Sequence, residues 1–536
     1  MNLAHFVTQS RRRFPDGIAL VHGGRNWTWA TFSQRVDAMA AALATRYGVA
    51  KGDRVMVQSA NGHAMFESMF ACFRIGAVWV PSNFRQTPDE VAYLAKASGA
   101  VGLIVADAFP EHARACAAQC PDLRFTIGIG RTGDAPDAGR DDDSPSTIGD
   151  DFDTIVSAHL GQPSPLAAVG RDDPCWFFFT SGTTGRPKAA ILTHGQMGFV
   201  VTNHLCDLMP GTSAATDASL VVAPLSHGAG IHQLAQVARG VKTVLLPTER
   251  LDIATAWALV ERWRITNLFT VPTILKLMVE HPSVAAHDHS SLRYVIYAGA
   301  PMYRTDQKRA LDTLGPVIVQ YFGLGEVTGN ITVLPPGDHA TTDDDPRPGT
   351  CGFERTGMQV SIQDDGGREL AAGETGEICV TGPAVFAGYF ETPDTIGANA
   401  KAFRDGWFRT GDLGHQDAAG YLYITGRASD MYISGGSNVY PREIEEKLLT
   451  HPAVAEAAVV GVPDPIWGEV GIAVCVLRPG TTLTGDQLAA WMDGRVARYK
   501  QPKRYVFWDA LPTSGYGKIA KKLIRETLRA RGLIVS

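Results

Sequence analysis

Apolar residues in the first 320 positions of this chain follow two alternating patterns. Short apolar runs predict buried strands, and stretches with apolar residues three and four positions apart predict helices. The runs predict strands over 55–57, 77–80, 101–105, 220–223, 243–246, 268–271, 294–297 and 317–319, and the helical pattern predicts helices over 66–75, 89–97 and 253–263. Such alternation is typical of an α/β fold with layered, largely parallel sheets, whose ligand crevice lies at the carboxyl ends of the strands.

The pattern changes twice in the remaining part of the chain. Residues 366–424 show short strands separated by glycine turns, which predicts a β-rich subdomain of the large domain. After about Arg427 the pattern predicts a small α+β unit, with a helix from Pro441, strands over 457–460, 471–477 and 505–508, and helices over 487–497 and 519–529. We therefore expect a large N-terminal domain over residues 1–429 and a small C-terminal domain over 430–536.

Composition narrows the class of protein. A chain of 536 residues is too long for a single core, and 45% hydrophobic with 19% charged residues is typical of a globular protein. The net charge of −6 argues against a nucleic-acid partner. An acidic segment over 131–153, rich in Pro, Gly and Ser, predicts a mobile surface loop. The chain contains no apolar run of 18 residues and no secretory signal, so we expect no membrane span and a cytoplasmic location; a homo-oligomer is compatible with the sequence.

The segment TSGTTGRPK, Thr180 to Lys188, directly follows the apolar run Trp176 to Phe179. A loop rich in Gly, Ser and Thr presents backbone N–H groups and hydroxyls, which bind phosphates. The spacing differs from that of the Walker loop, and the apolar run after it predicts a hairpin rather than a helix. A polar hairpin turn with no ligand is the alternative interpretation.

Five further segments follow in a characteristic order. They are GLGEVTG (323–329), GETGEICVTGPAVFAGYF (373–390), GWFRTGDLG (406–414), GRASDMYISGGSNVYPREIE (426–445) and GYGKI (515–519). Together with the first segment they resemble the motifs of the adenylate-forming superfamily, which includes acyl-CoA synthetases and peptide-synthetase adenylation domains. The resemblance implies an AMP-binding N-terminal domain and a mobile C-terminal domain that carries a catalytic lysine.

The resemblance assigns the phosphate and metal contacts. The β- and γ-phosphates of ATP are expected at the loop, on Thr180, Ser181, Gly182, Thr183, Thr184 and Lys188. Glu326 matches the family's Mg²⁺-binding glutamate, and a hard cation of this kind prefers oxygen ligands. The family usually has Thr before this glutamate, whereas this chain has Gly325. Thr328 is a substitute for the missing hydroxyl only if the turn allows it.

The resemblance also assigns the contacts to the nucleoside. Asp412 is expected to accept hydrogen bonds from the ribose hydroxyls, and Arg427 to contact the ribose or a phosphate. The segments that resemble the adenine-binding ones are Gly299, Ala300 and Pro301, and Tyr321, Phe322 and Gly323. A purely structural role is the alternative for these backbone contacts.

The C-terminal motifs imply a site that serves two reactions. Lys518 matches the catalytic lysine that bridges the substrate carboxylate and the α-phosphate, although it could also be one of several surface lysines. Asp430 matches the hinge about which the small domain rotates. Gly435 and Gly436 match the segment that contacts the pantetheine of coenzyme A.

The expected acyl pocket lies around His227, which matches a position that gates the carboxylate site; a buried structural histidine is the alternative. Gly228, Gly230 and Leu324 are expected beside it. The resemblance therefore implies an ATP- and Mg²⁺-dependent carboxylic acid:CoA ligase that acts through an acyl-adenylate, on a fatty or aryl-alkanoic acid. Two alternatives remain open: transfer of the acyl group to another acceptor such as a carrier protein, and a non-catalytic nucleotide-binding regulator.

Overall fold

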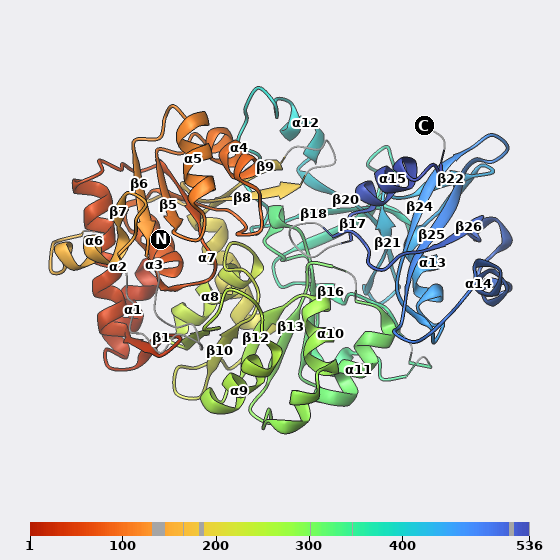
Figure 1. Ribbon diagram of the computed structural model, residues 1–536, viewed down its shortest axis with the longest axis horizontal. Coiled ribbons are helices and arrows are strands. Elements are labelled where there is room, and N and C mark those ends of the chain that lie inside the picture. The colour runs from red at the N-terminus through yellow and green to blue at the C-terminus, as the bar shows by residue number, and fades with distance from the viewer. Residues whose placement is uncertain are drawn as a thin grey trace.

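The computed structural model describes residues 1–130, 145–164, 166–181, 187–300, 302–342, 344–345, 347–513 and 519–534. The predicted sites at Gly182, Thr183, Thr184, Pro301 and Lys518 lie outside these residues. In the part that is described, a large N-terminal α/β domain with two layered sheets and a third, smaller sheet precedes a small C-terminal α+β domain. The small domain forms the blue right-hand side of Figure 1.

The first sheet of the large domain has seven strands, most of them parallel. Their order is β7 (Asp150–Asp151), β6 (Phe125–Ile129), β5 (Gly102–Ala106), β3 (Arg54–Gln58), β4 (Val78–Pro81), β8 (Pro174–Ser181) and β9 (Pro187–Thr193). Among the described strands of this sheet, only β8 and β9 pair antiparallel, so the hairpin predicted around the phosphate loop is confirmed. Helices α4 (Pro88–Ser98) and α5 (Pro110–Gln119) cover the outer face of this sheet.

The second sheet has nine strands. Their order is β16 (Phe353–Glu354), β15 (Thr332–Leu334), β14 (Ile318–Phe322), β13 (Tyr294–Tyr297), β12 (Asn267–Thr270), β10 (Ala218–Val221), β11 (Lys242–Leu245), β1 (Ile18–His22) and β2 (Arg25–Thr28). Its outer face packs on α9 (Ile253–Trp263), α10 (Pro272–Glu280) and α11 (Arg304–Leu314). The six strands from β14 to β1 are parallel, so their carboxyl ends meet at one edge.

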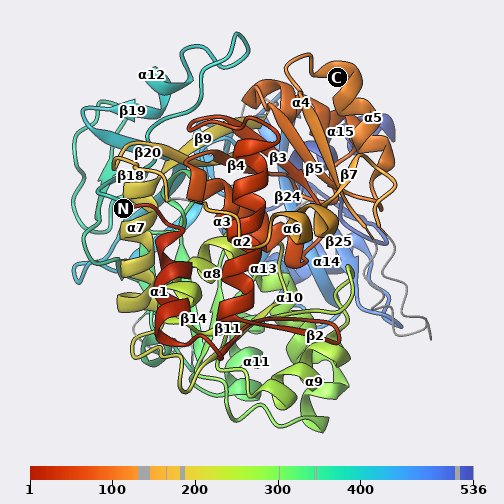
Figure 2. The same ribbon diagram turned by 90° about the vertical axis from the view of Figure 1, so that its left-hand side faces the viewer.

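One large apolar core fills the space between the two sheets. Helices α2 (Trp29–Thr45), α3 (His63–Ile75), α7 (His194–Asn203) and α8 (Gly228–Arg239) contribute to it, together with α1 (His5–Arg13) and α6 (Phe152–His159). Figure 2 shows α1, α2 and α7 on the side that faces the viewer. Residues 131–144 of the predicted loop over 131–153 lie outside the described residues. At its end the loop prediction is wrong, because β7 pairs with β6 and Asp151 caps α6 by accepting a hydrogen bond from the Thr154 amide.

The β-rich subdomain is a five-stranded antiparallel sheet. It contains β17 (Gln359–Gln363), β18 (Gly376–Thr381), β19 (Phe403–Arg404), β20 (Trp407–Gln416) and β21 (Leu422–Arg427), with the short helix α12 (Ala398–Ala402) beside it. It lies between the two layered sheets and the C-terminal domain in Figure 1.

The C-terminal domain has its own sheet of β22 (Tyr432–Ser434), β23 (Ser437–Val439), β24 (Val454–Asp464), β25 (Gly468–Leu477) and β26 (Arg504–Phe507). One face packs on α13 (Pro441–Leu448) and α14 (Gly485–Met492), and the other packs on α15 (Lys521–Ala530). Arg442 of α13 donates to the carbonyl of Ile424 at 3.1 Å, which joins this domain to the β-rich subdomain.

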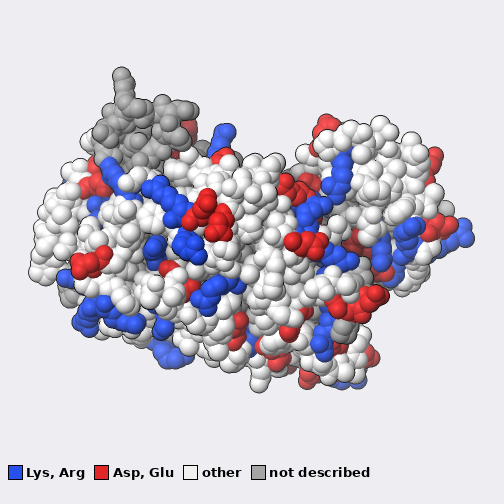
Figure 3. All heavy atoms as spheres, turned by 90° about the horizontal axis from the view of Figure 1, so that it is seen from below, with Lys and Arg blue, Asp and Glu red and all other residues white. Residues whose placement is uncertain are grey.

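None of the helices in the described ranges is long and apolar enough to cross a bilayer. On the face seen from below, Lys and Arg side chains alternate with Asp and Glu side chains (Figure 3).

Candidate active site

The site is built around the hairpin of β8 and β9. Thr180 and Lys188 lie opposite each other across this hairpin, and Ser181 pairs with Pro187 at its last described rung. The run from Trp176 to Phe179 is buried in the sheet, so Thr180, which follows it directly, is carried to the end of the strand. Two of the predicted phosphate contacts are therefore brought together by strand register.

Glu326 lies beside this hairpin in a short 3-10 turn over Gly325–Val327 and is only 5% exposed. The hydroxyl of Thr180 donates to its Oε1 at 2.8 Å, and the phenol of Tyr389 donates to the same oxygen at 2.8 Å. Burial and the neighbouring carboxylate raise the pKa of Tyr389 far above its ordinary value, so the phenol stays protonated and remains a donor.

The other carboxylate oxygen, Oε2, accepts no hydrogen bond from the residues that the structure describes. A nearly buried carboxylate with one oxygen held and the other available fits a hard divalent cation. The described residues contain no group of three or more His, Cys, Asp or Glu arranged as a complete metal cage. Glu326 as a single protein ligand fits Mg²⁺, which is usually held by one or two carboxylates together with substrate phosphates and water.

The packing of neighbouring side chains explains why position 325 is a glycine. A Cβ at this position would lie 2.6 Å from the Phe178 ring and 2.9 Å from the side chain of Thr180. Phe178 therefore occupies the space that a threonine would need. Thr328 does not replace that hydroxyl. Its backbone adopts a left-handed conformation, with φ 52°, and its side-chain hydroxyl donates to the carbonyl of the neighbouring Val327 at 2.6 Å.

The predicted ribose contacts form a pair on adjacent antiparallel strands. Asp412 of β20 lies opposite Arg427 of β21, and the Arg427 Nε lies 3.0 Å from Asp412 Oδ1. Asp412 is 5% exposed, whereas the Arg427 side chain is 46% exposed. The carboxylate is therefore fixed, and the guanidinium is accessible to a ligand.

The predicted adenine segments follow two neighbouring parallel strands. Gly299 follows β13 with φ 86°, a conformation that favours glycine, and Phe322 ends β14 in a half-buried position. Tyr321 points the other way, into the large core, where its ring stacks on Phe269 with the centroids 5.8 Å apart. Strand alternation therefore separates these two adjacent aromatic residues.

His227 directly precedes α8 and is half-buried. Its Nδ1 lies 2.9 Å from the hydroxyl of Ser226, and its ring packs in a T-shaped arrangement with that of Phe178, with the centroids 5.0 Å apart. A Cβ on Gly228 would lie 2.5 Å from the Phe269 ring, so this glycine permits close packing of the aromatic residue. The Phe178 ring thus packs against the position predicted to gate the carboxylate site, and the Phe269 ring packs against the residue that follows it.

The other predicted pocket residues differ in their surroundings. A Cβ on Gly230 would lie 2.0 Å from the Leu225 carbonyl oxygen and 2.9 Å from Trp176, so Gly230 is required by packing inside the core. Leu324 is half-buried and directly precedes the turn that carries Glu326.

A buried arginine that the sequence did not indicate lies behind Tyr321. The Arg355 guanidinium is 5.9 Å from the centre of the Tyr321 ring, and its Nη2 lies 3.3 Å from His204 Nδ1. The nearest carboxylate is that of Asp207, 3.8 Å from Nε, and burial lowers the pKa of Arg355 to about 10. No motif marks Arg355 in the sequence, because its partners come from other segments.

The hinge and coenzyme A predictions fall on the first turns after β21. Asp430 donates its amide to the carbonyl of Arg427 at 3.0 Å, in the turn that leads into the C-terminal domain. Gly435 and Gly436 have φ of 57° and 81° and connect β22 to β23. A Cβ on Gly435 would lie 2.9 Å from the Trp467 ring, so both a tight hairpin and a close contact require glycine here.

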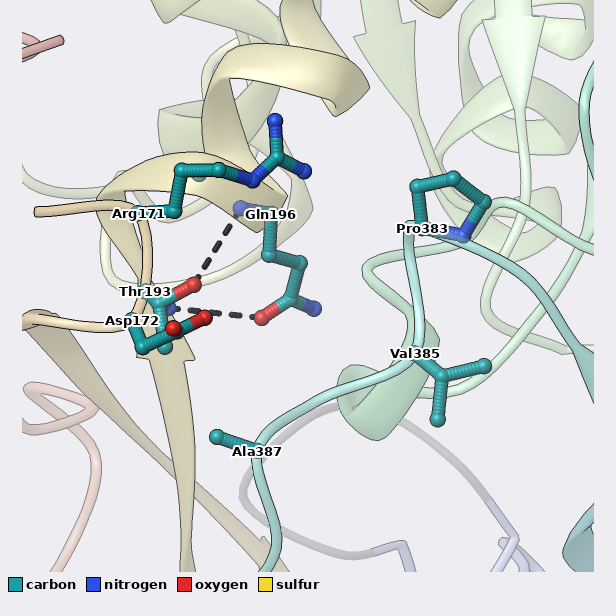
Figure 4. Close-up of a pocket in the computed structure, with 8 residues that line it drawn as sticks. Arg171, Asp172, Thr193, Gln196, Pro383, Val385 and Ala387 are labelled. Atoms are coloured by element: carbon teal, nitrogen blue, oxygen red, sulfur yellow. Dashed lines mark hydrogen bonds between the residues drawn. The ribbon is translucent and has the colours of Figure 1, made fainter. Parts of the chain in front are cut away.

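A small surface hollow of about 130 Å³ lies between the start of α7 and residues 383–387 (Figure 4). Within it, Thr193 and Gln196 form reciprocal hydrogen bonds, and the Gln196 side chain donates to the Ala384 carbonyl at 2.7 Å. This volume is below the range typical of small-molecule sites. The hollow marks the seam where the segment leading to Tyr389 is attached to α7.

Comparison with known proteins shows that the chain is similar to AMP-binding enzymes over most of its length. The profile of the AMP-binding enzyme family matches residues 7–390, and the profile of the AMP-binding enzyme C-terminal domain matches residues 443–518. A feruloyl-CoA synthase from Amycolatopsis sp is 38% identical over 98% of both chains, and an indoleacetate–CoA ligase from Aromatoleum aromaticum is 32% identical over 98% of both. The ATP-bound structure of MatB from Rhodopseudomonas palustris is similar, with a TM-score of 0.84, 29% identity and 99% of each chain covered.

Proposed function

This chain belongs to the AMP-binding enzyme family, and from that premise we propose that it is an acid–thiol ligase that forms an acyl-CoA through an acyl-adenylate. The observation that carries the proposal is the meeting of Thr180, Lys188 and Glu326 at the end of one hairpin. Hydroxyl, ammonium and carboxylate groups at one sheet edge suit a triphosphate and its cation. Names of full-length relatives that are CoA ligases support the same reaction.

In the first half-reaction, a carboxylate oxygen of the acid attacks the α-phosphorus of ATP. A P–O bond forms, the bond to the β-phosphate oxygen breaks, and pyrophosphate leaves with the electron pair. We assign the β- and γ-phosphates to Lys188, Thr180, Ser181, Gly182, Thr183 and Thr184. Mg²⁺ held by Glu326 would neutralise phosphate charge. Lys518 would lie between the two anions that combine, where fixed cations have their largest effect on rate.

The nucleoside would be held by groups on two sheets. We propose that Asp412 accepts from the ribose hydroxyls and that Arg427 contacts the ribose or α-phosphate. Gly299, Ala300, Pro301, Phe322 and Gly323 would enclose the adenine, whereas the buried Tyr321 would contribute to the floor of the acyl pocket. Holding acid and ATP in line is worth roughly 7–11 kcal/mol of the barrier.

In the second half-reaction, the thiolate of coenzyme A attacks the acyl carbon, the C–O bond to AMP breaks, and AMP leaves. We propose that the domain over 430–536 turns about Asp430 between the two half-reactions, so that Lys518 is withdrawn and Gly435 and Gly436 approach the pantetheine. The domain over 1–429 would keep AMP bound. Hinge positions need only absorb a change in backbone dihedrals.

We propose an aryl-alkanoic acid as the substrate, with a fatty acid as the alternative. The Phe178 ring packs against His227, and the Phe269 ring, which stacks on Tyr321, packs against Gly228. Flat aromatic rings beside the proposed acyl site suit a flat acyl group. The relatives named for ferulate and indoleacetate support this class. We also propose a cytoplasmic location, where ATP and coenzyme A are available.

Coenzyme A is tested as the acceptor of the acyl group against a carrier protein, the alternative acceptor. One relative, from Streptomyces coeruleorubidus, is named as a fatty acid–acyl-carrier-protein ligase and is 32% identical over 96% of this chain. A panel of aryl-alkanoic and fatty acids is scored by pyrophosphate release, and the best acid is then offered coenzyme A or a phosphopantetheinylated carrier protein. We expect thioester with coenzyme A; thioester with carrier protein alone would support the alternative.

A further inference from the structure

Tyr389 belongs to a short segment that extends the sheet beside the phosphate hairpin. Its backbone bridges to Ala190 of β9. On either side of it, the Ile191 amide donates to the Gly388 carbonyl at 2.9 Å, and the Phe390 amide donates to the Ala189 carbonyl at 2.8 Å. Tyr389 is therefore fixed opposite the strand that carries Lys188.

The same segment holds Glu326 in two ways. The Phe386 amide donates to the main-chain carbonyl of Glu326 at 2.8 Å, and the Tyr389 phenol donates to its carboxylate Oε1 at 2.8 Å. Because the main chain and the side chain are both tied to one segment, the direction of the carboxylate is restricted. Oε2, which receives no hydrogen bond from the described residues, is left to face a cation.

The ring of Tyr389 contacts the second charged group of the site. The Lys188 Nζ lies 4.9 Å from the ring centroid, within the range of a cation–π interaction. One side chain therefore touches both the carboxylate expected to hold the metal and the ammonium expected to hold phosphate. Neither contact depends on the other, since one uses the hydroxyl and the other uses the ring face.

The backbone of Tyr389 is itself fixed by Asn399. The Tyr389 amide donates to Asn399 Oδ1 at 2.7 Å, and the Asn399 amide group donates to the Tyr389 carbonyl at 3.0 Å. Gly388 has φ 106°, and a Cβ there would lie 3.0 Å from Asn399 Oδ1. The position of the phenol is thus determined by three elements: β9, the turn of Glu326, and Asn399.

We infer that Tyr389 is a positioning residue for metal-bound ATP: its hydroxyl aligns Glu326 with the cation, and its ring aligns Lys188 with the phosphates. This inference rests on the proposed function for its ligand, ATP with a divalent metal. A purely structural Tyr389, packed edge-on against Phe386 with the centroids 4.8 Å apart, would change only stability when it is replaced.

The test measures how much a metal improves ATP binding to the full-length protein in the absence of acid and coenzyme A. The dissociation constant of ATP is measured by calorimetry in Mn²⁺ and in EDTA, and the ratio of the two gives the coupling. Tyr389→Phe removes only the hydroxyl, so we expect the ratio to fall about tenfold, as for loss of a hydrogen bond to a charged group, with the EDTA value within about twofold of wild type. Tyr389→Leu also removes the ring, so ATP binding in EDTA should weaken by about two- to fivefold.

Tyr47→Phe is the matched control, because Tyr47 also donates its phenol to a carboxylate, that of Asp150, at 2.6 Å in another part of the domain. It should leave the ratio unchanged, and the electron paramagnetic resonance spectrum of bound Mn²⁺ should change in Tyr389→Phe but not in Tyr47→Phe. An unchanged ratio in Tyr389→Phe, or equal losses in Mn²⁺ and EDTA, would overturn the inference.

If Tyr389→Phe does not fold, Asn399→Ala tests the inference instead, because it loosens the backbone of Tyr389 and leaves the phenol intact. The inference predicts that the improvement of ATP binding by Mn²⁺ is smaller in this variant than in the wild type, and an equal improvement contradicts it. The test is separable from that of the proposed function, because it uses no acid. Absence of acid-dependent pyrophosphate release would refute the ligase activity while a lowered ratio still supported the role of Tyr389. A wild-type protein that binds ATP no better in Mn²⁺ than in EDTA would refute this inference even if the ligase activity were present.

Discussion

Gly325 illustrates how a single residue is determined by its neighbours rather than by its own chemistry. The sequence shows that the usual threonine of the superfamily is missing, but it does not show why. The reason lies in Phe178, whose ring occupies the space that a Cβ would need, 147 positions earlier in the chain. The hydroxyls that reach Glu326 come from Thr180 and Tyr389 instead.

This packing predicts the behaviour of Gly325→Thr. The added side chain would displace the Phe178 ring, and overpacking of this kind typically costs about 1–3 kcal/mol. We expect a lower melting temperature and a lower rate of pyrophosphate release. Combining it with Phe178→Leu should restore part of the stability, since residues in contact are not additive. If the double variant were as unstable as the sum of the two single variants, the ring would not be the cause.

His339 predicts a dependence of stability on pH. It is 5% exposed, its Nδ1 lies 2.8 Å from the Pro335 carbonyl and its Nε2 lies 3.2 Å from the Tyr297 hydroxyl. Burial lowers the pKa of His339 to about 4 from an ordinary value of 6.5. The unfolded chain therefore binds the extra proton between pH 6.5 and 4, so the contribution is complete above pH 6.5 and is lost as the pH falls.

The matching variant is His339→Gln, which keeps hydrogen-bonding capacity but does not titrate. The slope of the unfolding free energy against pH should be smaller in this variant by about 1.4 kcal/mol per pH unit within that window. Chemical denaturation at several pH values measures it. Identical slopes for the variant and the wild type would show that His339 does not titrate in this way.

At the scale of elements, strands and helices with local signals could be predicted from the sequence. Helix α9 has the predicted bounds because Asp252 caps its start through the Thr255 amide, and Arg264 ends it in a left-handed conformation. The helix predicted over 487–497 is too long, since α14 ends at Met492 and Gly494 has φ 72°. The sequence does not indicate the start of α6, because its cap, Asp151, cannot be told apart from the other acidic residues of the same segment.

Contacts between distant elements could not be predicted in this way. Tyr389 lies within a glycine-rich motif, but its hydroxyl partner is 63 positions away, and nothing local indicates that β9 and the turn of Glu326 converge on it. Arg355 and Tyr321 likewise meet only after β14 has placed its alternate residues on opposite faces. The sequence motifs therefore identify which residue types belong to the site, whereas the topology of the sheets determines which of these residues are in contact.

The alternation along β14 predicts the effect of Tyr321→Ala. Removal of this ring from its stack on Phe269 should enlarge the proposed acyl pocket and uncover the Arg355 guanidinium, which lies 5.9 Å from the ring centre. We expect kcat/KM for longer acids, and for acids with a distal carbonyl or carboxylate, to rise about tenfold relative to phenylpropanoic acid, the scale of discrimination that one methylene gives in an apolar pocket. Stability should fall by about 3–5 kcal/mol, which a melting curve measures. Unchanged preferences across the acid panel would place the acyl group elsewhere.

At the scale of the whole molecule, the account requires two arrangements of the same two domains. The described contacts between them include a hydrogen bond from Arg442, in the first turn of α13, to the carbonyl of Ile424. Asp430 lies in the turn between β21 and β22, where the chain passes from one domain into the other.

Two substitutions should separate the half-reactions. Lys518→Ala should lower adenylate formation by about 100-fold or more, because a cation aimed at the reacting anions is lost, while supplied acyl-AMP is still converted to thioester. Asp430→Pro should form adenylate but lose thioester formation, since proline restricts the hinge. Single-turnover measurements of each step check both. If both variants lost both steps equally, rotation of the small domain would be contradicted.

The most direct test of the central claim is isotope exchange between pyrophosphate and ATP with the wild-type protein. An enzyme that forms an acyl-adenylate reversibly should exchange label only when a suitable acid is present and without any need for coenzyme A, and addition of coenzyme A should then yield thioester and AMP. Exchange that does not depend on the acid, or cleavage of ATP to ADP and phosphate, would contradict the account.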